Sequence, residues 1–354
     1  MGIVTLGQSR QGVHGRALGP HLACKLGMFR QPAFAWSSCA IGLVLVAAVR
    51  AAPLPEGQTG IAARYPGDVG IASDPSVVFA DDFESYSSVS GVAARWNNLY
   101  HVSNTRLATE PSTVYRGGKS LEFTVPQTGA EVSNSAVKTV NPPTDVLFVR
   151  YYGKLSAGFD VLGSSHNGGT ISARYCCPGV RADGFNKFLV SFEAWRGLAA
   201  EPNPGRLNAY VYHPEQRDIW GDHFFPTGLV LPNTSVPFDF GPEFVPRADV
   251  TPVLDRWYSY ELMVKANRPG QRDGRVAMWV DGQLVADFPN LRLRETVALT
   301  IDQFTVDLHV NSNARNVVRK WFDNVVAARS YIGPVTSAVV PIPQEPTGFR
   351  IVAR

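Results

Sequence analysis

Two stretches of this chain place phenols, cations and amides where they share one face of a strand. Side chains two residues apart point to the same side of a strand. The faces in question carry Arg150, Tyr152 and Lys154 within residues 146–155, and Asn208, Tyr210 and Tyr212 within residues 207–213. Aromatic rings and planar donors suit sugar rings, which present apolar faces and hydroxyl groups. We therefore expect these faces to contact a carbohydrate, with plain solvated sheet as the alternative.

Residues 257–267 and 304–311 show the same alternation. Their polar positions include Glu261, Lys265, His309 and Asn311, and the intervening positions are apolar. A strand with one apolar and one hydrogen-bonding face is typical of a two-sheet sandwich, in which each sheet turns one face to the core. The predicted fold is therefore all-β, a two-sheet antiparallel β-sandwich.

Composition agrees with this fold class. The 354 residues are 45% hydrophobic and 18% charged, which argues against a disordered or coiled-coil chain. The 32 glycines and 26 prolines provide the turns that short strands require. We expect one β-sandwich domain over residues 77–334, a linker over 53–76 and a flexible tail over 335–354. The net charge of +3 is too small to favour nucleic acid as a partner.

The N-terminus resembles an export signal. Lys25 and Arg30 precede an apolar run at residues 40–49, and Ala51 and Ala52 offer a peptidase site. The run is shorter than the roughly 20 apolar residues of a transmembrane helix. Residues 1–52 are thus expected to be a signal peptide or, alternatively, an uncleaved anchor that forms the protein's contact with a membrane. A secreted, periplasmic or cell-surface location follows.

Cysteine use is low. Cys24 and Cys39 would leave with a cleaved signal, so the mature chain would keep Cys176 and Cys177. Neighbouring cysteines rarely pair, because ordinary disulfide geometry separates the two Cα atoms further. We expect two thiols in a loop.

The hairpin over residues 257–282 resembles a known group. Trp257 opens a strand, an Asn-x-Pro-Gly turn begins at Asn267, and Asp-Gly pairs stand at Asp273 and Asp281. This pattern is similar to that of alginate- and glucuronan-lyase-like polysaccharide lyases, which have concanavalin-like β-jelly rolls. The resemblance implies a jelly roll and an acidic polysaccharide as the partner. It also implies cleavage by β-elimination, in which a base removes the C5 proton and an acid protonates the leaving oxygen.

The resemblance also assigns residues. Tyr210 and Tyr212 match the family's Tyr-x-Tyr, whose phenols act in proton transfer, and Arg150 and Lys154 would hold the cationic field that a phenolate needs. The family's Ser-x-Arg pair falls on Val190 and Phe192 here, which leaves Lys187 or Glu193 to substitute. The expected substrate-binding residues are His166, Asn167, Lys187, Glu193, His213, Gln216, His223, Glu261, Lys265, His309 and Asn311.

Other activities stay open. Glu193 and Glu261 are the strand carboxylates to test for glycoside hydrolysis. A non-catalytic polysaccharide-binding module and a structural scaffold are the further alternatives. The chemistry needs no cofactor, although Asp81, Glu84 and Asp323 could hold a structural calcium ion or simply cap strands. We expect a monomer.

Overall fold

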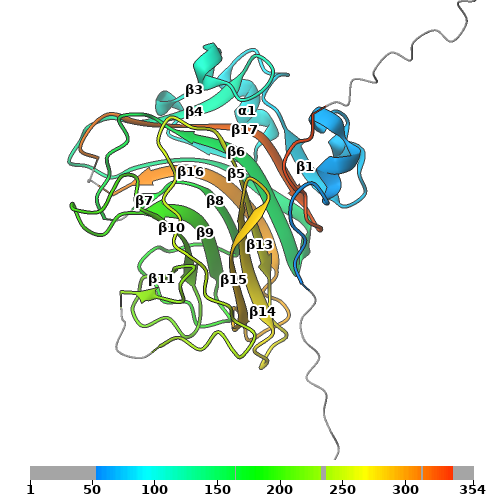
Figure 1. Ribbon diagram of the computed structural model, residues 1–354, viewed down its shortest axis with the longest axis vertical. Helices are drawn as coiled ribbons and strands as arrows, with labels where there is room; N and C mark the ends of the chain where they lie inside the picture. Colours follow the sequence, from blue (N-terminus) through cyan, green and yellow to red (C-terminus); the bar gives the residue numbers. More distant parts are fainter. Residues whose placement is uncertain (1–52, 164, 233–236, 312–313, 338–354) are drawn as a thin grey trace, which may run out of the picture. The chain divides into compact units, whose positions relative to one another are not determined.

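Alternating apolar side chains fold this chain into two antiparallel sheets that pack on each other (Figure 1). The computed structural model describes residues 53–337 apart from 164, 233–236 and 312–313, and the described residues belong to one compact unit. The predicted all-β, two-sheet antiparallel sandwich is confirmed. Each sheet turns one face to the common core and one face away from it, so either outer face could carry a site.

Sheet A has eight strands in the described part of the chain. In spatial order they are β15 (Gln283–Leu291), β14 (Gly274–Val280), β13 (Tyr258–Lys265), β6 (Val146–Leu155), β17 (Val318–Ala328), β4 (Ser120–Val125) and β3 (Thr105–Ala108), with β1 (Val77–Asp81) also paired to β17. The predicted strand over residues 146–155 is β6.

Sheet B has nine strands in the same part of the chain. In spatial order they are β12 (Val230–Leu231), β11 (Asp222–Phe224), β10 (Arg206–Tyr212), β9 (Phe188–Trp195), β8 (Gly169–Ala173), β16 (Ile301–Val310), β5 (Val132–Thr144) and β2 (Asn98–Tyr100), with β7 (Ser165–His166) also paired to β16. The helical segments are short: η1 (Ile61–Arg64), η2 (Pro66–Asp68), η3 (Ile71–Ser73), α1 (Val89–Arg95), η4 (Val102–Asn104) and η5 (Pro111–Thr113).

The core lies between the sheets because their apolar positions face each other. Leu207, Ala209 and Val211 of β10 join one buried cluster with Leu147 and Val149 of β6. Fully burying a Val or Leu side chain stabilises the fold by about 1.5–3 kcal/mol. Since side chains alternate along a strand, the remaining positions of β10 face away from the core.

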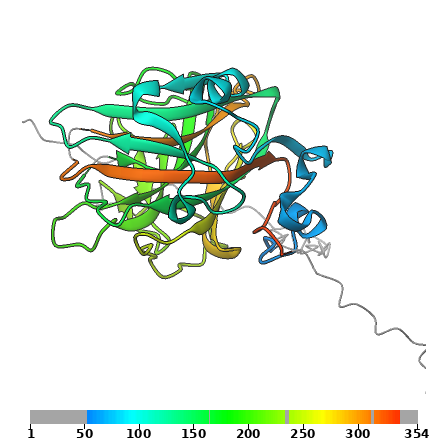
Figure 2. The ribbon, with the colours of Figure 1, turned by 90° about the horizontal axis from the view of Figure 1, so that it is seen from above.

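Sheet A is covered on its outer face as well. Ile61, Ile71 and Ile332 pack there against Phe148 and Trp279. The backbone N–H of Ile61 donates to the carbonyl of Tyr331 at 3.0 Å, so the two ends of the described chain lie together, as the blue and red segments in Figure 2 show. The segment 53–76, predicted as a linker because it lacks periodicity, is therefore packed structure, and residues 335–337 join it.

Residues 1–52, predicted as a signal peptide or anchor, and tail residues 338–354 lie outside the described residues. Among the helices that the structure describes, none combines the length and hydropathy that crossing a bilayer requires.

Candidate functional site on the polar face of sheet B

The polar side chains of sheet B gather on the face turned away from sheet A, called here the polar face. Tyr210 pairs with Ser191 of β9 on one side and with His223 of β11 on the other, and Asn208 pairs with Glu193. Residues in register on neighbouring strands share a face, so the pleat brings these side chains together. The polar face comprises His166, Thr170, Ser191, Glu193, Asn208, Tyr210, Tyr212, His223, Thr305, Asp307 and His309.

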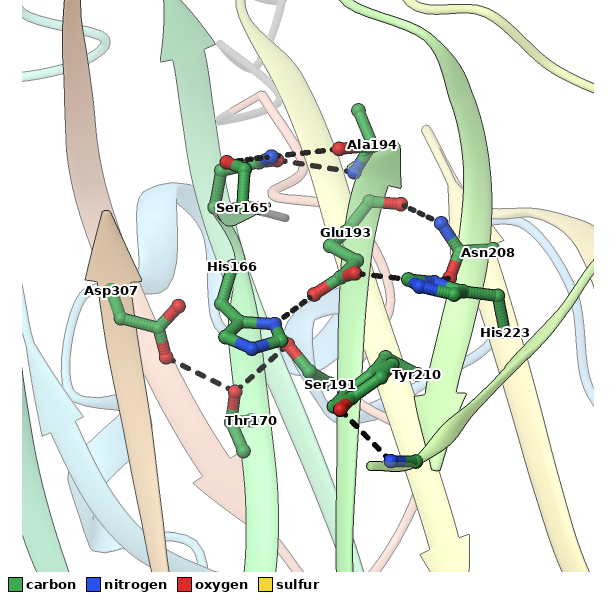
Figure 3. A network of polar contacts seen from close by, with 12 residues as sticks. Ser165, His166, Thr170, Ser191, Glu193, Ala194, Asn208, Tyr210, His223 and Asp307 are labelled. Atoms are coloured by element: carbon green, nitrogen blue, oxygen red, sulfur yellow. Dashed lines mark hydrogen bonds and ion pairs between the residues drawn. The ribbon is translucent and has the colours of Figure 1, made fainter. Parts of the chain in front are cut away.

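Glu193 lies between two histidines (Figure 3). Its Oε2 is 2.7 Å from Nδ1 of His166, and its Oε1 is 3.6 Å from Nδ1 of His223. Glu193 is 1% exposed, so its carboxylate has little water to solvate it. A buried charge is costly unless it is paired, and the two imidazoles are the groups placed to compensate it.

The His166–Glu193 pair is held as an ion pair by mutual attraction. Burial favours the neutral imidazole, but the neighbouring Glu193 carboxylate and its hydrogen bond raise the pKa of His166 above the ordinary value. Burial raises the pKa of Glu193, and His166 opposes that rise. A protonated His166 uses its Nδ1–H on Glu193 and keeps its Nε2–H as a second donor, which could hold a carboxylate.

His223 is the opposite case. Burial and the nearby positive His166 lower the pKa of His223 to about 3, so this imidazole is neutral at neutral pH. Its Nδ1 is 2.9 Å from Oδ1 of Asn208, whose Nδ2 donates to the carbonyls of Glu193 and Arg206 at 3.4 Å. Since the amide oxygen accepts, Nδ1 of His223 carries the proton. Nε2 therefore carries the lone pair and is the basic nitrogen.

Tyr210 lies between the two imidazoles. Its ring centroid is 4.8 Å from that of His166 and 4.9 Å from that of His223. The N–H of Gly221 donates to the phenol oxygen at 2.9 Å. Burial, followed by the neighbouring Tyr212, raises the pKa of Tyr210, so the phenol keeps its proton. Such a group can donate a proton to a leaving oxygen but is a poor base at neutral pH.

A second carboxylate closes the polar face on its β16 side. Oδ2 of Asp307 accepts hydrogen bonds from the hydroxyls of Thr305 at 2.7 Å and Thr170 at 3.0 Å. The ring of His309 stacks on that of His166 at 5.3 Å. Burial and the positive His166 lower the pKa of His309 to about 4, so it too is neutral at neutral pH.

Exposure differs sharply across the polar face. The side chains of His166, His309 and His223 are 29%, 18% and 14% exposed. Tyr210 and Tyr212 are 6% and 2% exposed. A ligand that approaches this face meets imidazoles first. A cavity of 280 Å³ lies elsewhere, beside β1 and lined in part by Arg95 and Lys138.

The predicted cations do not join this face. Arg150 is fully buried on the outer face of sheet A. Its guanidinium lies 2.5 Å from Asp68, which belongs to the segment 53–76 that covers this face, called here the covering segment. Lys154, on the same face, lies 2.6 Å from Asp255 and donates to the carbonyl of Ser112. The expected pooling of these cations with Tyr210 and Tyr212 is wrong, because β6 and β10 belong to different sheets.

Glu261 and Lys265 are also on sheet A. The carboxylate of Glu261 accepts the backbone N–H groups of Ile332 and Gly333 at 2.8 and 2.9 Å, and Lys265 is exposed at the end of β13. Glycoside hydrolysis needs two carboxylates within about 5–9.5 Å. Glu193 and Glu261 face outward from opposite sheets, which pack about 10 Å apart, so they do not form such a pair.

Other predicted ligands serve the backbone. The amide of Asn167 bonds both the N–H and the carbonyl of Ala194, and Gln216 accepts the N–H of His213 at 3.0 Å. The ring of His213 pairs with Asp222 at 3.1 Å, where both are buried on the core side. Nζ of Lys187 donates to the backbone carbonyls of Cys176 and Cys177 and lies over the ring of Tyr212. Asn311 is exposed.

The three predicted calcium ligands accept hydrogen bonds from protein groups. Asp81 accepts from Trp96 and Tyr86, Glu84 from the backbone of the 117–119 turn, and Asp323 from the N–H groups of Tyr115 and Arg116. Within the described ranges, no three His, Cys, Asp or Glu side chains group as metal ligands do. The calcium ion stays a prediction.

Four residues of the polar face were not among the predicted site residues: Thr170, Ser191, Thr305 and Asp307. Ser191 bonds the Thr170 hydroxyl at 3.0 Å, and both belong to the polar face. Ser191 is two residues before Glu193 on the same strand, so its side chain must share the face of Glu193, and strand alternation could have identified it. The predicted Ser-x-Arg positions, Val190 and Phe192, point into the core instead.

The fold is polysaccharide lyase-like, since it is similar to that of solved alginate lyase structures. A mutant of the alginate lyase Aly36B in complex with alginate tetrasaccharide superposes with a TM-score of 0.53, at 16% identity over 73% of this chain and 99% of that chain. A second structure of alginate lyase Aly36B gives a TM-score of 0.53, with 17% identity and the same coverage.

An endo-β-1,4-glucuronan lyase from the fungus Trichoderma reesei gives a TM-score of 0.47, with 16% identity over 72% of this chain and 96% of that one. No family model and no curated protein sequence matches this chain. At these identities the likeness establishes the fold, and the chemistry must be argued from the polar face itself.

Proposed function

We propose that the polar face of sheet B binds an acidic polysaccharide and cleaves it by β-elimination. The observation that carries this proposal is the arrangement of one protonated imidazole, one neutral imidazole and one protonated phenol around Glu193. The shared fold with an alginate lyase crystallised with alginate tetrasaccharide gives it further support.

His166 is proposed to neutralise the uronate carboxylate. The C5 proton of a uronate becomes acidic only when negative charge on the adjacent carboxyl group is stabilised, which is the role of a cationic or amide donor. Glu193 favours the charged form of His166 and fixes its ring through Nδ1. The Nε2–H is then the donor toward substrate, and the 29% exposure of this side chain makes it accessible.

His223 and Tyr210 are proposed as base and acid. Nε2 of His223 accepts the C5 proton, the electron pair forms the C4–C5 double bond, and the bond from C4 to the glycosidic oxygen breaks. The phenol O–H of Tyr210 gives its proton to that oxygen. The environment keeps each group in the protonation state that its role requires at neutral pH, His223 neutral and Tyr210 protonated.

A non-catalytic polysaccharide-binding module is the second candidate. The observation that favours it is the low exposure of Tyr210 and Tyr212, at 6% and 2%. A phenol so covered reaches a glycosidic oxygen only if neighbouring side chains yield when substrate binds. The histidines alone would then contact the glycan.

Incubation of the full chain with alginate and with glucuronan, followed by ultraviolet absorbance of the unsaturated uronate, tests the first candidate. Cellulose oligosaccharides, which lack the carboxylate, are the control polymer. Absorbance that rises with the uronates and is lost in His223→Gln supports elimination. Binding of the uronates without new absorbance supports the module, and absence of both excludes both candidates.

We also propose that the protein is exported and acts as a monomer. Lys25, Arg30 and the apolar run that follows support export. N-terminal sequencing of the protein recovered from the medium, periplasm or cell surface tests this, since residues up to Ala52 should be missing if the signal is cleaved. Light scattering tests the monomer.

A further inference from the structure

Cys176 and Cys177 stand in the loop between β8 and β9 with their sulfur atoms 2.8 Å apart, and both are exposed. In an extended strand neighbouring side chains point to opposite faces, which would separate the two sulfurs. Here Cys177 has a positive φ of 56°, an uncommon conformation for a residue with a Cβ. That turn brings both thiols to the same side.

A buried lysine holds this turn from below. Nζ of Lys187 donates to the carbonyl of Cys176 at 2.9 Å and to the carbonyl of Cys177 at 2.7 Å. Two successive carbonyls therefore point to a single ammonium, whereas in a strand they would alternate. Lys187 is 1% exposed, so its bonds to these carbonyls compensate the burial of its charge.

The same lysine contacts the polar face. Its ammonium lies 4.7 Å from the centroid of the Tyr212 ring and 5.3 Å from that of Tyr175. Tyr212 in turn packs edge-on against Tyr210, with centroids 5.6 Å apart. The carbonyls of Cys176 and Cys177 are thus connected to Tyr210 by successive contacts through Lys187 and Tyr212, so a movement of these carbonyls can be transmitted to Tyr210.

We propose that Cys176 and Cys177 form a redox-active dithiol that closes to a disulfide between neighbouring residues, and that closure shifts Lys187 and Tyr212. The co-reactant is a small-molecule disulfide. The thiolate of one cysteine attacks it and forms a mixed disulfide with release of one thiol. The second cysteine then attacks the sulfur of the first cysteine and releases the second small thiol. The protein thus loses two hydrogens and two electrons while the small disulfide becomes two thiols.

The closed form requires movement of the clamped backbone. A disulfide bond is about 2.05 Å long, so the sulfurs must approach from their present separation. Because their Cα atoms are consecutive, most of that approach comes from rotation of the peptide between them, whose carbonyl is one of the two that Lys187 binds. The hydrogen bond between the thiols raises the pKa of Cys176, so closure should accelerate as pH rises.

Trypsin gives a direct test, because it cleaves after Arg174 and Arg181 and releases both cysteines in one peptide. The folded full chain is treated with glutathione disulfide, alkylated and digested. The expected peptide is about 2 Da lighter than the dithiol form and takes no alkyl group until it is reduced. A doubly alkylated peptide, or one that retains glutathione, would overturn the proposal.

Two variants separate closure from its consequence. Cys177→Ser should keep glutathione on Cys176, which shows that the thiol is accessible. Lys187→Met should close faster, because the peptide between the two cysteines is no longer held and can rotate. Equal closure rates in Lys187→Met and the parent protein contradict the role of the clamp. The amide resonances of Lys187 and Tyr212 should shift on closure and that of Glu261, on sheet A, should not. Unshifted resonances at Tyr212 exclude the coupling.

Discussion

Tyr210 on β10 lies directly across from His223 on β11, with ring centroids 4.9 Å apart. The two side chains experience opposite effects of burial, since burial raises the pKa of the phenol and lowers that of the imidazole. Groups that differ in this way suit opposite proton-transfer roles at one pH. The cross-strand register thus places a proton donor beside a proton acceptor.

Tyr210→Phe should lower turnover of a uronate polymer by about 10²–10⁴-fold, the usual contribution of general acid catalysis. Glycan affinity should change little, because the ring and its contacts remain. Tyr212→Phe is the matched control on the same strand and should lose less, since Tyr212 is 2% exposed. Initial rates and binding isotherms measure both. Equal losses in the two variants would remove the special role of Tyr210.

Glu193→Gln should lower the pKa of His166. Burial lowers that pKa and the Glu193 carboxylate raises it, so removal of its charge leaves burial opposed only by the smaller effects of Asp307 and Glu131. Proton NMR of the His166 ring during a pH titration measures the change, and turnover should fall with it. An unchanged His166 titration would show that Glu193 does not hold the imidazole in its charged form.

The pH dependence of kcat/KM should follow the two imidazoles. His166 must be protonated, so the rate should fall as pH rises through its pKa, which lies above the ordinary value. His223 must be neutral, and its pKa of about 3 places the acid limb below the range in which most histidine-dependent enzymes lose activity. A rate that increases steadily from neutral to alkaline pH would contradict the role of His166.

Arg150→Met should destabilise the fold by about 3–5 kcal/mol, because it leaves the buried Asp68 carboxylate without its cationic partner. Turnover per folded molecule should be unchanged, since Arg150 is on the outer face of sheet A. Lys265→Met, on the same sheet but exposed, is the control and should change stability by less than about 0.5 kcal/mol. Urea unfolding and active-site-normalised rates distinguish this structural role from a catalytic one.

Glu261 should make stability depend on pH. Burial raises its pKa to about 7, so the folded protein binds a proton that the unfolded chain, with an ordinary glutamate, releases near pH 4.5. This contribution is fully present below that lower pH and is lost as pH rises toward 7, by about 3 kcal/mol at most. Glu261→Gln should reduce the decline of unfolding free energy over this interval. An identical slope would contradict the raised pKa.

Strand alternation predicted the local part of this structure. It identified Val146–Leu155 as a strand and placed Asn208, Tyr210 and Tyr212 on one face, as the structure does. Alternation distinguishes the two faces of a strand but carries no information on which sheet the strand joins. Arg150 and Tyr210 therefore looked equivalent in sequence, although strand pairing separates them.

The packing of the covering segment and the contacts among the histidines could not be predicted from local sequence patterns. Ile61 and Ile71 are too far apart in an irregular stretch to give a period, yet they are buried against sheet A. His166, His223 and their common partner Glu193 were each predicted to bind substrate, but nothing in the sequence indicated that they contact one another. Their meeting depends on the pairing of β7, β9, β10 and β11, which are long-range contacts that no local pattern encodes.

The backbone hydrogen bond between Ile61 and Tyr331 has a practical consequence for any assay of this protein. Both ends of the described chain emerge beside sheet A, on the side of the sandwich that does not carry His166 and His223. Attachment to a sensor chip or a fusion partner through residue 53 or residue 337 would thus leave the imidazoles turned toward the solution. Long polymers could then reach them without crossing the tether.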